Sequence, residues 1–469
     1  MRFFFVSVYN LLKMSLPEAD KIISENESFL RKVSGKKPIS DISLFLHREK
    51  EVRGEEIRNL WTDFARRKRP EDTIGFYTHF PFCAKKCSYC IYASNENDGS
   101  ESDSYLKRVF SHYEYFSDVF QNISFTNLYF GGGTPNMMSD AQIDLLLRRL
   151  YRHYKFDDDG EKTFEGNPAF STPSKLRILK DHGINRLSFG VQSFDEDVLR
   201  SNDRFFGGVA KAIADAVEVG FEDINADLII GLHGDTAGNV IDGFKRLLEL
   251  GATAVHIYPL QMKPEYVARY FGGNKALAEG HKMSLIEEAM PKIIELADDN
   301  GFWHRRFLEG FYTPDNEVSF NFERGGKRDY EKKAYFSSRP GGLNSIFGVG
   351  DWSNSNILGR KVNYMIEKIS ENPADDVFRA TFFSEREWLA DYIEGIFFAN
   401  RIISRFDFRE KFGSDIYDYF PEEMALLERD GMIKAEGDKI FFTSPDGTER
   451  VKYLLSFFDR NKIKEFDGE

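Results

Sequence analysis

Three cysteines lie within eight residues of one another, and they are the only cysteines in a chain of 469 residues. Cys83, Cys87 and Cys90 directly follow a short apolar run, Thr73–Phe80, that is typical of a β-strand. Three thiolates on one tight loop can bind three irons of a four-iron four-sulfur cubane and leave the fourth iron open to another ligand. The odd number and the clustering favour a shared ligand in a reducing compartment over a disulfide.

Zinc is the competing ligand for the same thiolates, with His79 as a candidate fourth donor. Structural zinc sites usually combine two well-separated pairs of Cys or His residues. The sequence has no second pair of cysteines, so the spacing favours an iron–sulfur cluster. Lys85 and Lys86 lie between the thiolates and are expected to offset part of their charge, although most such lysines are simply solvated.

Further along the chain, other residue patterns are typical of ligand contacts at strand ends. The three glycines before Thr134-Pro135 end a strand and would let a ligand approach the backbone closely, unless they only form a tight turn. Glu165 ends another strand, where a carboxylate can accept both hydroxyls of a ribose; a helix cap or a surface ion pair is the alternative. Asp227 lies inside an apolar strand, and such buried acids are usually paired.

In this order, the motifs resemble those of the radical S-adenosylmethionine (SAM) superfamily, and Tyr-x-His-x-Pro-Phe-Cys is similar to the branch of oxygen-independent coproporphyrinogen III oxidase and its relatives. The resemblance covers residues 73–260 well and residues 340–450 weakly. It implies a 4Fe-4S cluster on the three cysteines, and SAM at the open iron. The SAM contacts that it implies are Tyr77, Tyr89, Gly132, Gly133, Thr134, Glu165, Gln192, Arg204 and Asp227.

The roles of these residues are also implied by the resemblance. The Gly132–Gly133 edge would meet the amino group of SAM, and Glu165 and Asp227 would meet its adenosine. Arg204 is suited to the carboxylate of SAM because its donors form a planar fork. His256, on the sixth apolar run, is expected to be a satisfied core histidine.

Six apolar runs alternate with helical patterns and predict a parallel sheet. The runs are Thr73–Phe80, Thr126–Phe130, Lys162–Glu165, Asn185–Val191, Ile224–Ile230 and Ala254–Pro259. Six units are fewer than the eight of a closed barrel, so an open, TIM-like partial (β/α)6 barrel is expected, with its functional face at the carboxyl ends of the strands. The predicted units are an N-terminal helical extension (1–70), the barrel (71–330) and a small C-terminal α/β module that covers the substrate (331–469).

Charge and hydropathy exclude several classes of protein. The chain carries 63 Lys and Arg against 76 Asp and Glu, a net charge of −13, which argues against general affinity for nucleic acid or anionic lipid. No apolar stretch approaches the roughly 18–20 residues of a membrane span. The N-terminal apolar run lacks a cleavage site, and residues 1–13 are interpreted as an upstream start ahead of Met14. A cytoplasmic protein is predicted.

The expected activity is that of a radical SAM oxidoreductase similar to coproporphyrinogen dehydrogenase: a 5′-deoxyadenosyl radical would initiate oxidative decarboxylation of a tetrapyrrole propionate. A flavodoxin or ferredoxin would supply the electron. A methyltransferase with a second SAM, or a heme-chaperone-like binding protein, is the alternative.

Some residues depart from this resemblance on the substrate side. Tyr92 stands where the oxidases have a fourth cysteine, Gly231-Leu-His-Gly-Asp-Thr236 replaces Gly-Leu-Pro-Gly-Gln-Thr, and no histidine follows residue 304 to serve as a chaperone-type heme ligand. Arg305 and Arg306 are candidates for binding substrate carboxylates, or else an ordinary solvated pair.

Overall fold

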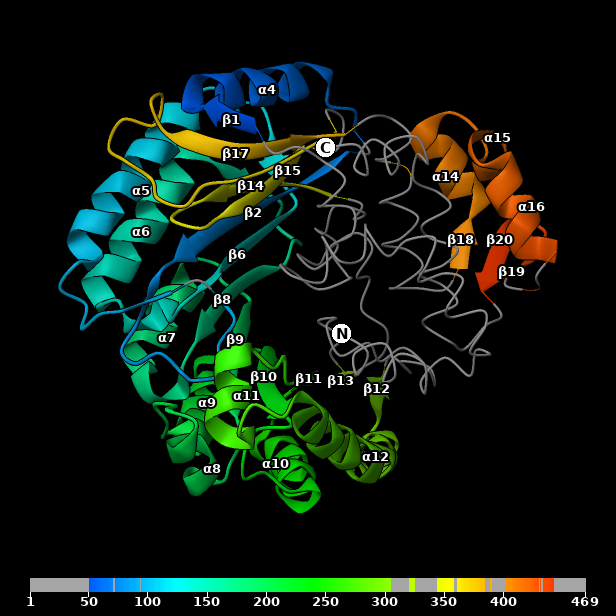
Figure 1. The fold of residues 1–469 in the computed structure, drawn as a ribbon. Coiled ribbons are helices and arrows are strands. Elements are labelled where there is room, and N and C mark those ends of the chain that lie inside the picture. The colour runs from blue at the N-terminus through cyan, green and yellow to red at the C-terminus, as the bar shows by residue number, and fades with distance from the viewer. Residues whose placement is uncertain are drawn as a thin grey trace.

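The structure is a computed structural model that describes residues 50–70, 72–92, 94–304, 320–324, 344–357, 361–383, 389, 402–429, 431 and 433–442. They form a mixed α/β fold around a 13-stranded sheet (Figure 1) with the strand order β1-β17-β16-β15-β14-β2-β6-β8-β9-β10-β11-β13-β12. The strands of this sheet are β1 (Lys50–Arg53), β2 (Thr73–Phe80), β6 (Asn127–Gly132), β8 (Lys162–Gly166), β9 (Arg186–Gln192), β10 (Asp223–Ile230), β11 (Ala254–Pro259), β12 (Phe302–His304), β13 (Phe320–Arg324), β14 (Asn344–Val349), β15 (Asn354–Ile357), β16 (Val362–Met365) and β17 (Val377–Phe382).

The central strands β2, β6, β8, β9, β10 and β11 pair in parallel, each with the next. They coincide with the six predicted runs to within a few residues, so the parallel α/β sheet is confirmed. The helices that follow or flank them are α5 (Ser102–Phe116), α6 (Asp140–His153), α7 (Pro173–Asp181), α8 (Glu196–Ser201), α9 (Val209–Val219), α10 (Ala237–Leu250), α11 (Pro264–Phe271) and α12 (Lys275–Asp299). The sheet order found for the described strands is linear, with β1 and β12 at its ends, which is consistent with a partial barrel.

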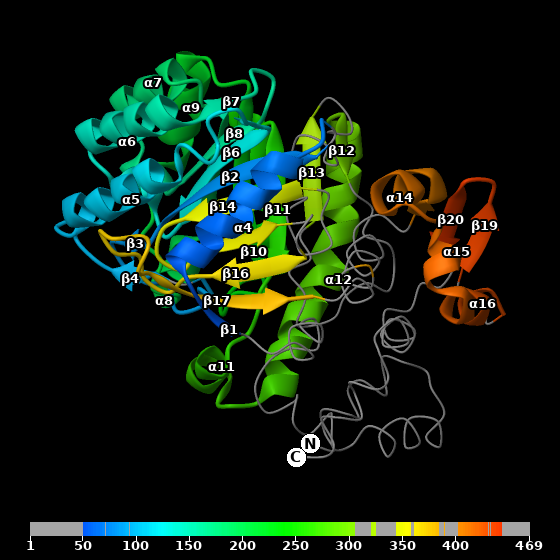
Figure 2. The ribbon, with the colours of Figure 1, turned by 90° about the horizontal axis from the view of Figure 1, so that it is seen from above.

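The two faces of the sheet differ in character because side chains alternate along each strand. Helices α5, α6, α7, α9 and α10 lie along the outer side of the curved sheet (Figures 1 and 2). The outward Phe76 packs against Tyr113 of α5 and Phe347 of β14, with ring centroids 5.7 and 5.4 Å apart. The opposite face carries polar side chains such as Tyr129 and Glu165, which therefore point away from these helices.

Strands from both ends of the chain extend the sheet beyond β2. β14 pairs in parallel with β2, β15 to β17 follow in antiparallel pairs, and β1 adds an antiparallel edge. Helix α4 (Gly54–Arg67) packs on this part: Trp61 Nε1 donates a hydrogen bond of 2.5 Å to the Tyr364 hydroxyl of β16. The predicted unit boundaries at residues 70 and 331 stay predictions, but the sheet takes strands from both sides of each.

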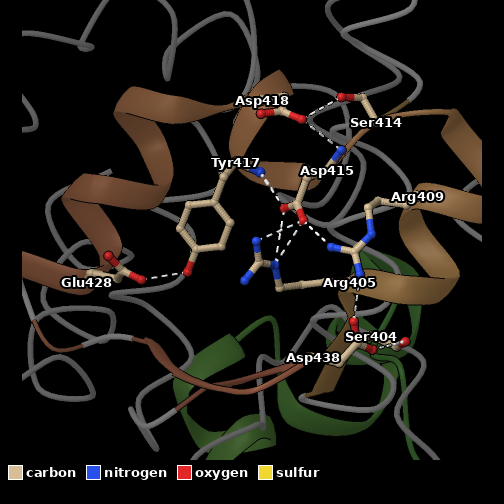
Figure 3. Close-up of polar contacts among 9 residues, drawn as sticks. All are labelled: Ser404, Arg405, Arg409, Ser414, Asp415, Tyr417, Asp418, Glu428 and Asp438. Carbon is tan, nitrogen blue, oxygen red and sulfur yellow. Dashed lines mark hydrogen bonds and ion pairs between the residues drawn. The ribbon is translucent and has the colours of Figure 1, made fainter.

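The C-terminal part of the chain has a sheet of its own, in the order β18-β20-β19. It consists of β18 (Ile402–Ser404), β19 (Ile433–Glu436) and β20 (Lys439–Phe442), with α14 (Arg405–Phe412), α15 (Ile416–Tyr419) and α16 (Pro421–Arg429). Figure 3 shows Arg405 and Arg409 around Asp415, at 2.9 and 2.6 Å, while Arg409 also pairs with Asp438 at 3.0 Å. This network ties α14 to α15 and to the β19–β20 turn. The sequence of residues 420–430 has a helical pattern, and α16 is found there, followed by the strand pair β19 and β20.

The predicted N-terminal helical extension also contains a strand, because Lys50–Arg53 forms β1, a four-residue edge strand. Residues 384–401, whose sequence has a helical pattern, lie outside the described residues except for Leu389. None of the described helices has the length and apolar sequence that a membrane span needs.

Candidate cofactor site

The cysteine loop begins where β2 ends. A two-residue strand, β3 (Phe82–Cys83), pairs with β4 (Asn95–Glu96) and closes the loop on itself. Cys87 is buried, Cys83 and Cys90 are half-buried, and all three are free thiols. Burial raises the pKa of the Cys90 thiol, and the neighbouring Cys87 and Cys83 raise it further. The three sulfurs are therefore near enough to influence one another electrostatically.

Asn202, which follows α8, holds the middle of this loop. Its backbone oxygen accepts hydrogen bonds from the Ser88 amide and hydroxyl, each 3.1 Å long. Its own side chain is fully buried: the amide donates to Val198 O at 2.7 Å and His233 O at 3.0 Å, and Oδ1 accepts from the Tyr266 hydroxyl at 2.5 Å. The loop is thus positioned by protein contacts. Asn202 was not predicted as a site residue, since Ser88, His233 and Tyr266 are distant from it along the chain.

Helix α11 and Lys263, directly before it, also contact the cysteine loop. The Tyr270 hydroxyl lies 3.0 Å from Ser88 Oγ, and Lys263 Nζ donates to the Cys90 carbonyl oxygen. Asp203, at a left-handed φ of 57°, pairs with Lys85 at 3.2 Å and with Arg269 at 2.5 Å. Lys85 was expected to offset thiolate charge. In the structure its ammonium group instead pairs with Asp203.

The glycine motif lies directly against the start of the cysteine loop. The Gly133 amide donates to Phe80 O at 2.7 Å, and the Thr134 amide to Phe82 O at 2.8 Å. A Cβ at Gly133 would lie 2.4 Å from Phe82 O, so no larger residue fits there. The Thr134 hydroxyl is 3.4 Å from Cys83 Sγ. Two motifs that are 51 residues apart thus meet at the carboxyl ends of β2 and β6.

The two predicted acids lie on the inner face of the sheet. Glu165 Oε1 accepts a 2.5 Å hydrogen bond from the Tyr129 hydroxyl, and Oε2 accepts one from the Gly132 amide at 3.3 Å. Asp227 accepts from Asn225 Nδ2 at 2.7 Å and from Ser188 Oγ at 3.3 Å. Burial raises the pKa of Glu165 to about 7 and also raises the pKa of Asp227. The Asp227 charge contributes to the Glu165 shift, so the acids share one environment.

Arg204 and Gln192 lie next to each other at the end of β9. Arg204 donates to the Gly190 carbonyl oxygen, and its NH1 atom is 3.8 Å from Cys87 Sγ. A Cβ on Gly190 would lie 2.7 Å from Gln192 Nε2 and 3.0 Å from Arg204 NH2, so both side chains converge on this glycine. Gln192 itself has a left-handed φ of 73°. The guanidinium group faces the buried cysteine as well as the strand end.

The two predicted tyrosines lie on either side of the cysteine motif. The Tyr77 hydroxyl is 2.8 Å from His79 Nδ1, and the Tyr77 ring lies 6.2 Å from the Tyr129 ring. Tyr89 is buried, which raises the pKa of its hydroxyl, and it lies close to Cys87. All nine predicted SAM contacts thus lie in the carboxyl-terminal halves of central strands or in the segments that follow these strands. Arg305 and Arg306 lie outside the described residues.

Comparison with known proteins identifies the family of this site. The Radical SAM superfamily model matches residues 77–247, which include the cysteine loop, the glycine motif and both acids. Heme chaperone HemW of Bacillus subtilis (strain 168) is 27% identical over 387 residues, covering 78% of this chain and 94% of that protein. The matched residues 77–247 belong to the Radical SAM superfamily.

Two kinds of relative match most of the chain, heme chaperone HemW and oxygen-independent coproporphyrinogen III oxidase. The oxidase of Helicobacter pylori (strain ATCC 700392 / 26695) is 25% identical over 418 residues, which cover 84% of this chain and 86% of the oxidase. The solved structure of coproporphyrinogen III oxidase (HemN) from Escherichia coli has the same fold, with a TM-score of 0.68 and 21% sequence identity. The match covers 87% of this chain and 93% of the solved chain.

Membership of the radical SAM family implies a 4Fe-4S cluster and SAM, and the donor set fits a cluster. Each thiolate of a cubane binds a different iron, whereas zinc needs donors that converge at about 2.0–2.3 Å on one ion. No three His, Cys, Asp or Glu side chains gather around a single ion position in the part of the chain that the structure describes. His79, the candidate fourth zinc ligand, instead contacts Tyr77 through Nδ1. Three thiols on one loop, each of which can bind a different iron, fit a cluster.

Proposed function

We propose that this protein is a radical SAM enzyme that binds a 4Fe-4S cluster through Cys83, Cys87 and Cys90. The observation that carries the proposal is the contact of the cysteine loop with the glycine motif, through the Thr134 amide and Phe82 O at 2.8 Å. When bound, the cluster and SAM supply a 5′-deoxyadenosyl radical that removes a hydrogen atom from the substrate. We further propose that the sheet is a partial (β/α)6 barrel whose carboxyl end holds these groups.

The polar side chains of the inner face bind and orient SAM in this proposal. Glu165 and Asp227 accept hydrogen bonds from the adenosine, and Tyr129 keeps Glu165 in place through its 2.5 Å hydrogen bond. Arg204 binds the carboxylate of the methionine part, for which its half-buried guanidinium group is suited. The edge at Gly132 and Gly133 admits the amino group because it lacks side chains.

For the substrate, we propose a tetrapyrrole propionate that undergoes oxidative decarboxylation, in a cytoplasmic protein that takes its electron from a flavodoxin or ferredoxin. The proposal is supported by the similarity to the Helicobacter pylori oxidase over 86% of that protein. The C-terminal module (331–469) would cover the substrate, and Arg305 and Arg306 would bind its carboxylates. Tyr92, in place of a fourth cysteine, is the residue that argues for a change in substrate.

A heme-chaperone-like binding protein is the second candidate. It is supported by the similarity to HemW over 94% of that protein. Against it stands the absence of any histidine after residue 304, because a histidine heme ligand of the chaperone type is then unavailable in that region. A radical SAM methyltransferase is the third candidate function. It would differ from the other two by releasing S-adenosylhomocysteine.

One experiment separates these candidates. The anaerobically reconstituted protein is incubated with SAM, dithionite and coproporphyrinogen III, and the products are separated by mass spectrometry. The oxidase proposal predicts 5′-deoxyadenosine together with loss of CO2 from the porphyrinogen. S-adenosylhomocysteine would favour the methyltransferase. Stoichiometric heme binding without 5′-deoxyadenosine would favour the chaperone and overturn the enzyme proposal.

A further inference from the structure

The turn after β14 holds a tryptophan in a backbone conformation that suits glycine. The Ser353 amide donates a hydrogen bond of 3.0 Å to the Gly350 carbonyl oxygen, which closes a β-turn over residues 350–353. Trp352, the third residue of this turn, has a left-handed φ of 60°. Turns with a positive φ at the third residue usually have glycine or asparagine there, because a bulky side chain is strained in that conformation. The turn alone therefore does not account for a tryptophan at this position.

The turn lies at the end of the sheet that carries the candidate cofactor site. β14 pairs in parallel with β2, and β2 pairs in parallel with β6, so the carboxyl ends of the three strands lie side by side (Figure 1). The cysteine loop follows β2, and the glycine motif is at the end of β6. The turn is thus on the opposite side of β2 from the glycine motif.

Trp352 is connected to the cofactor site through His79. The two rings are in a T-shaped arrangement, with centroids 6.4 Å apart. A Cβ on Gly350 would lie 2.6 Å from the His79 carbonyl oxygen, so the turn packs directly against β2. A Cβ on Gly132, a glycine proposed to meet SAM, would lie 2.7 Å from His79 Nε2. The imidazole ring of His79 therefore lies between Trp352 and the edge at Gly132.

Trp352 differs from a tryptophan that serves the core. Trp61 is fully buried, packs against Phe120 and Phe347, and bonds to Tyr364. Trp352 is only half-buried, so part of it stays accessible at the carboxyl end of the sheet. Residues held in strained backbone conformations cluster at functional sites, where the surrounding structure maintains them. The strain and the exposure of Trp352 together indicate a role in binding.

The two neighbours of Trp352 keep the turn in place. Asp351 is buried, and its Oδ1 accepts a hydrogen bond of 2.8 Å from the Ile369 amide. Ser353 is also buried, and its carbonyl oxygen accepts one of 3.3 Å from the Ile366 amide. The indole is therefore presented from an anchored backbone, and a group that is already ordered loses little conformational entropy when it binds a ligand.

We propose that Trp352 is a specificity-determining residue for the substrate, and that its indole ring stacks on a flat π-electron ring such as a pyrrole of a tetrapyrrole. The proposal rests on the proposed function for the end of the sheet at which the reaction occurs and for the class of substrate. Indole offers a large, rigid π-surface, and aromatic rings attract one another in offset-stacked and edge-to-face arrangements. Trp352 would thus hold the substrate beside the SAM edge at Gly132 without contacting SAM.

The backbone conformation is tested without any ligand. Trp352→Gly and Trp352→Ala both remove the ring, but glycine alone is unstrained at a left-handed φ. Chemical denaturation should therefore give a higher midpoint for Trp352→Gly than for Trp352→Ala. Equal midpoints, or a lower one for Trp352→Gly, would mean that the turn is not strained at Trp352 and would overturn the proposal.

The binding test titrates cluster-loaded protein with coproporphyrin III, a stable planar tetrapyrrole, and follows its fluorescence without oxygen. Trp352→Leu keeps apolar bulk but has no ring, and it should bind about 3- to 10-fold more weakly, which is the worth of an aromatic pair beyond its buried area. Trp352→Phe keeps a ring and should bind within about twofold of the wild type. Phe382→Leu is the matched control: Phe382 is 41% exposed, but it pairs with Val362 at the start of β16, at the opposite end of the sheet.

Equilibrium dialysis with SAM and iron per protein are measured on the same variants, and both should match the wild type. A parallel loss of SAM affinity or iron in Trp352→Leu would mean that Trp352 only supports His79, and would overturn the proposal. Wild-type binding of coproporphyrin III by Trp352→Leu, equal weakening in Trp352→Phe, or equal weakening in Phe382→Leu would also overturn it. If the wild-type protein does not bind coproporphyrin III, the proposed substrate fails, and this proposal fails with it.

Discussion

Ser88 and Asn202 are joined by a backbone hydrogen bond of 3.1 Å although they are 114 residues apart in the chain. The bond fixes the middle of the cysteine loop to the turn after α8. That turn is itself anchored by the buried side chain of Asn202, which bonds to Val198, His233 and Tyr266. Protein contacts therefore connect the cysteine loop to the turn after α8.

Asn202→Ala should loosen this loop and reduce the amount of cluster it retains. The substitution removes the acceptor of the Tyr266 hydroxyl and the side-chain donor to His233 O, at a cost of about 1–3 kcal/mol for each buried group left unsatisfied. Iron per protein after anaerobic reconstitution and gel filtration, together with the unfolding temperature, measures the effect. Asn300→Ala, at the exposed end of α12, is the control and should retain iron as the wild type does. Equal retention in both variants would show that Asn202 does not position the loop.

Trp61→Ala should strongly destabilise the part of the sheet that holds β14 to β17. Trp61 is fully buried, packs against Phe347 with ring centroids 5.5 Å apart, and bonds to Tyr364. Loss of a large buried aromatic side chain typically costs about 3–5 kcal/mol. Chemical denaturation compares this variant with Arg66→Ala on the exposed face of the same helix, for which little change is expected. Similar unfolding free energies would mean that α4 is only loosely attached.

Glu165 should make the stability of the cluster-free protein depend on pH. Burial raises its pKa to about 7 in the fold, so the folded state binds the proton more tightly than the unfolded state does. Its contribution is full at acidic pH and is lost as the pH rises through about 7. In Glu165→Gln, which is neutral at every pH, the free energy of unfolding should fall less between about pH 5 and 8. Glu218→Gln, on the exposed side of α9, should behave as the wild type; an unchanged pH profile in Glu165→Gln would contradict the shift.

Glu165→Ala and Asp227→Ala should weaken SAM binding and leave the cluster intact. Each removes an acceptor from the inner face, and neither side chain contacts the cysteine loop in the described contacts. A charge-assisted hydrogen bond contributes about 1.5–3 kcal/mol, so affinity should fall roughly 10- to 100-fold. Dialysis measures the affinity, and the visible spectrum measures the cluster. Wild-type affinity in both variants would remove these acids from the SAM site.

Much of the central sheet could be predicted because its signal is local. Strands such as β2 and β11 are short apolar runs bounded by turns, with amphipathic helices between them, so alternation alone predicts a parallel sheet. The cysteine spacing and the glycine motif likewise lie in short continuous segments.

The rest depends on contacts between distant segments. β1 is four residues long with Val52 as its buried residue, a pattern too short to identify a strand. The pairing of β14 with β2 places Ile346 opposite Gly75, and nothing local in either segment specifies that partner. Asn202 is an ordinary polar residue in the sequence, and it becomes part of the site only because the fold buries it beside Ser88.

The central claim is that Cys83, Cys87 and Cys90 hold a 4Fe-4S cluster that cleaves SAM. The most direct measurement is the electron paramagnetic resonance spectrum of the anaerobically reconstituted, dithionite-reduced protein with and without SAM, paired with quantification of 5′-deoxyadenosine. We predict about four irons per chain, a spectrum that SAM alters because one iron is open, and 5′-deoxyadenosine that disappears when any one of the three cysteines is replaced by alanine. Stoichiometric zinc without iron, or a cluster whose spectrum does not change when SAM is added, would contradict the central claim.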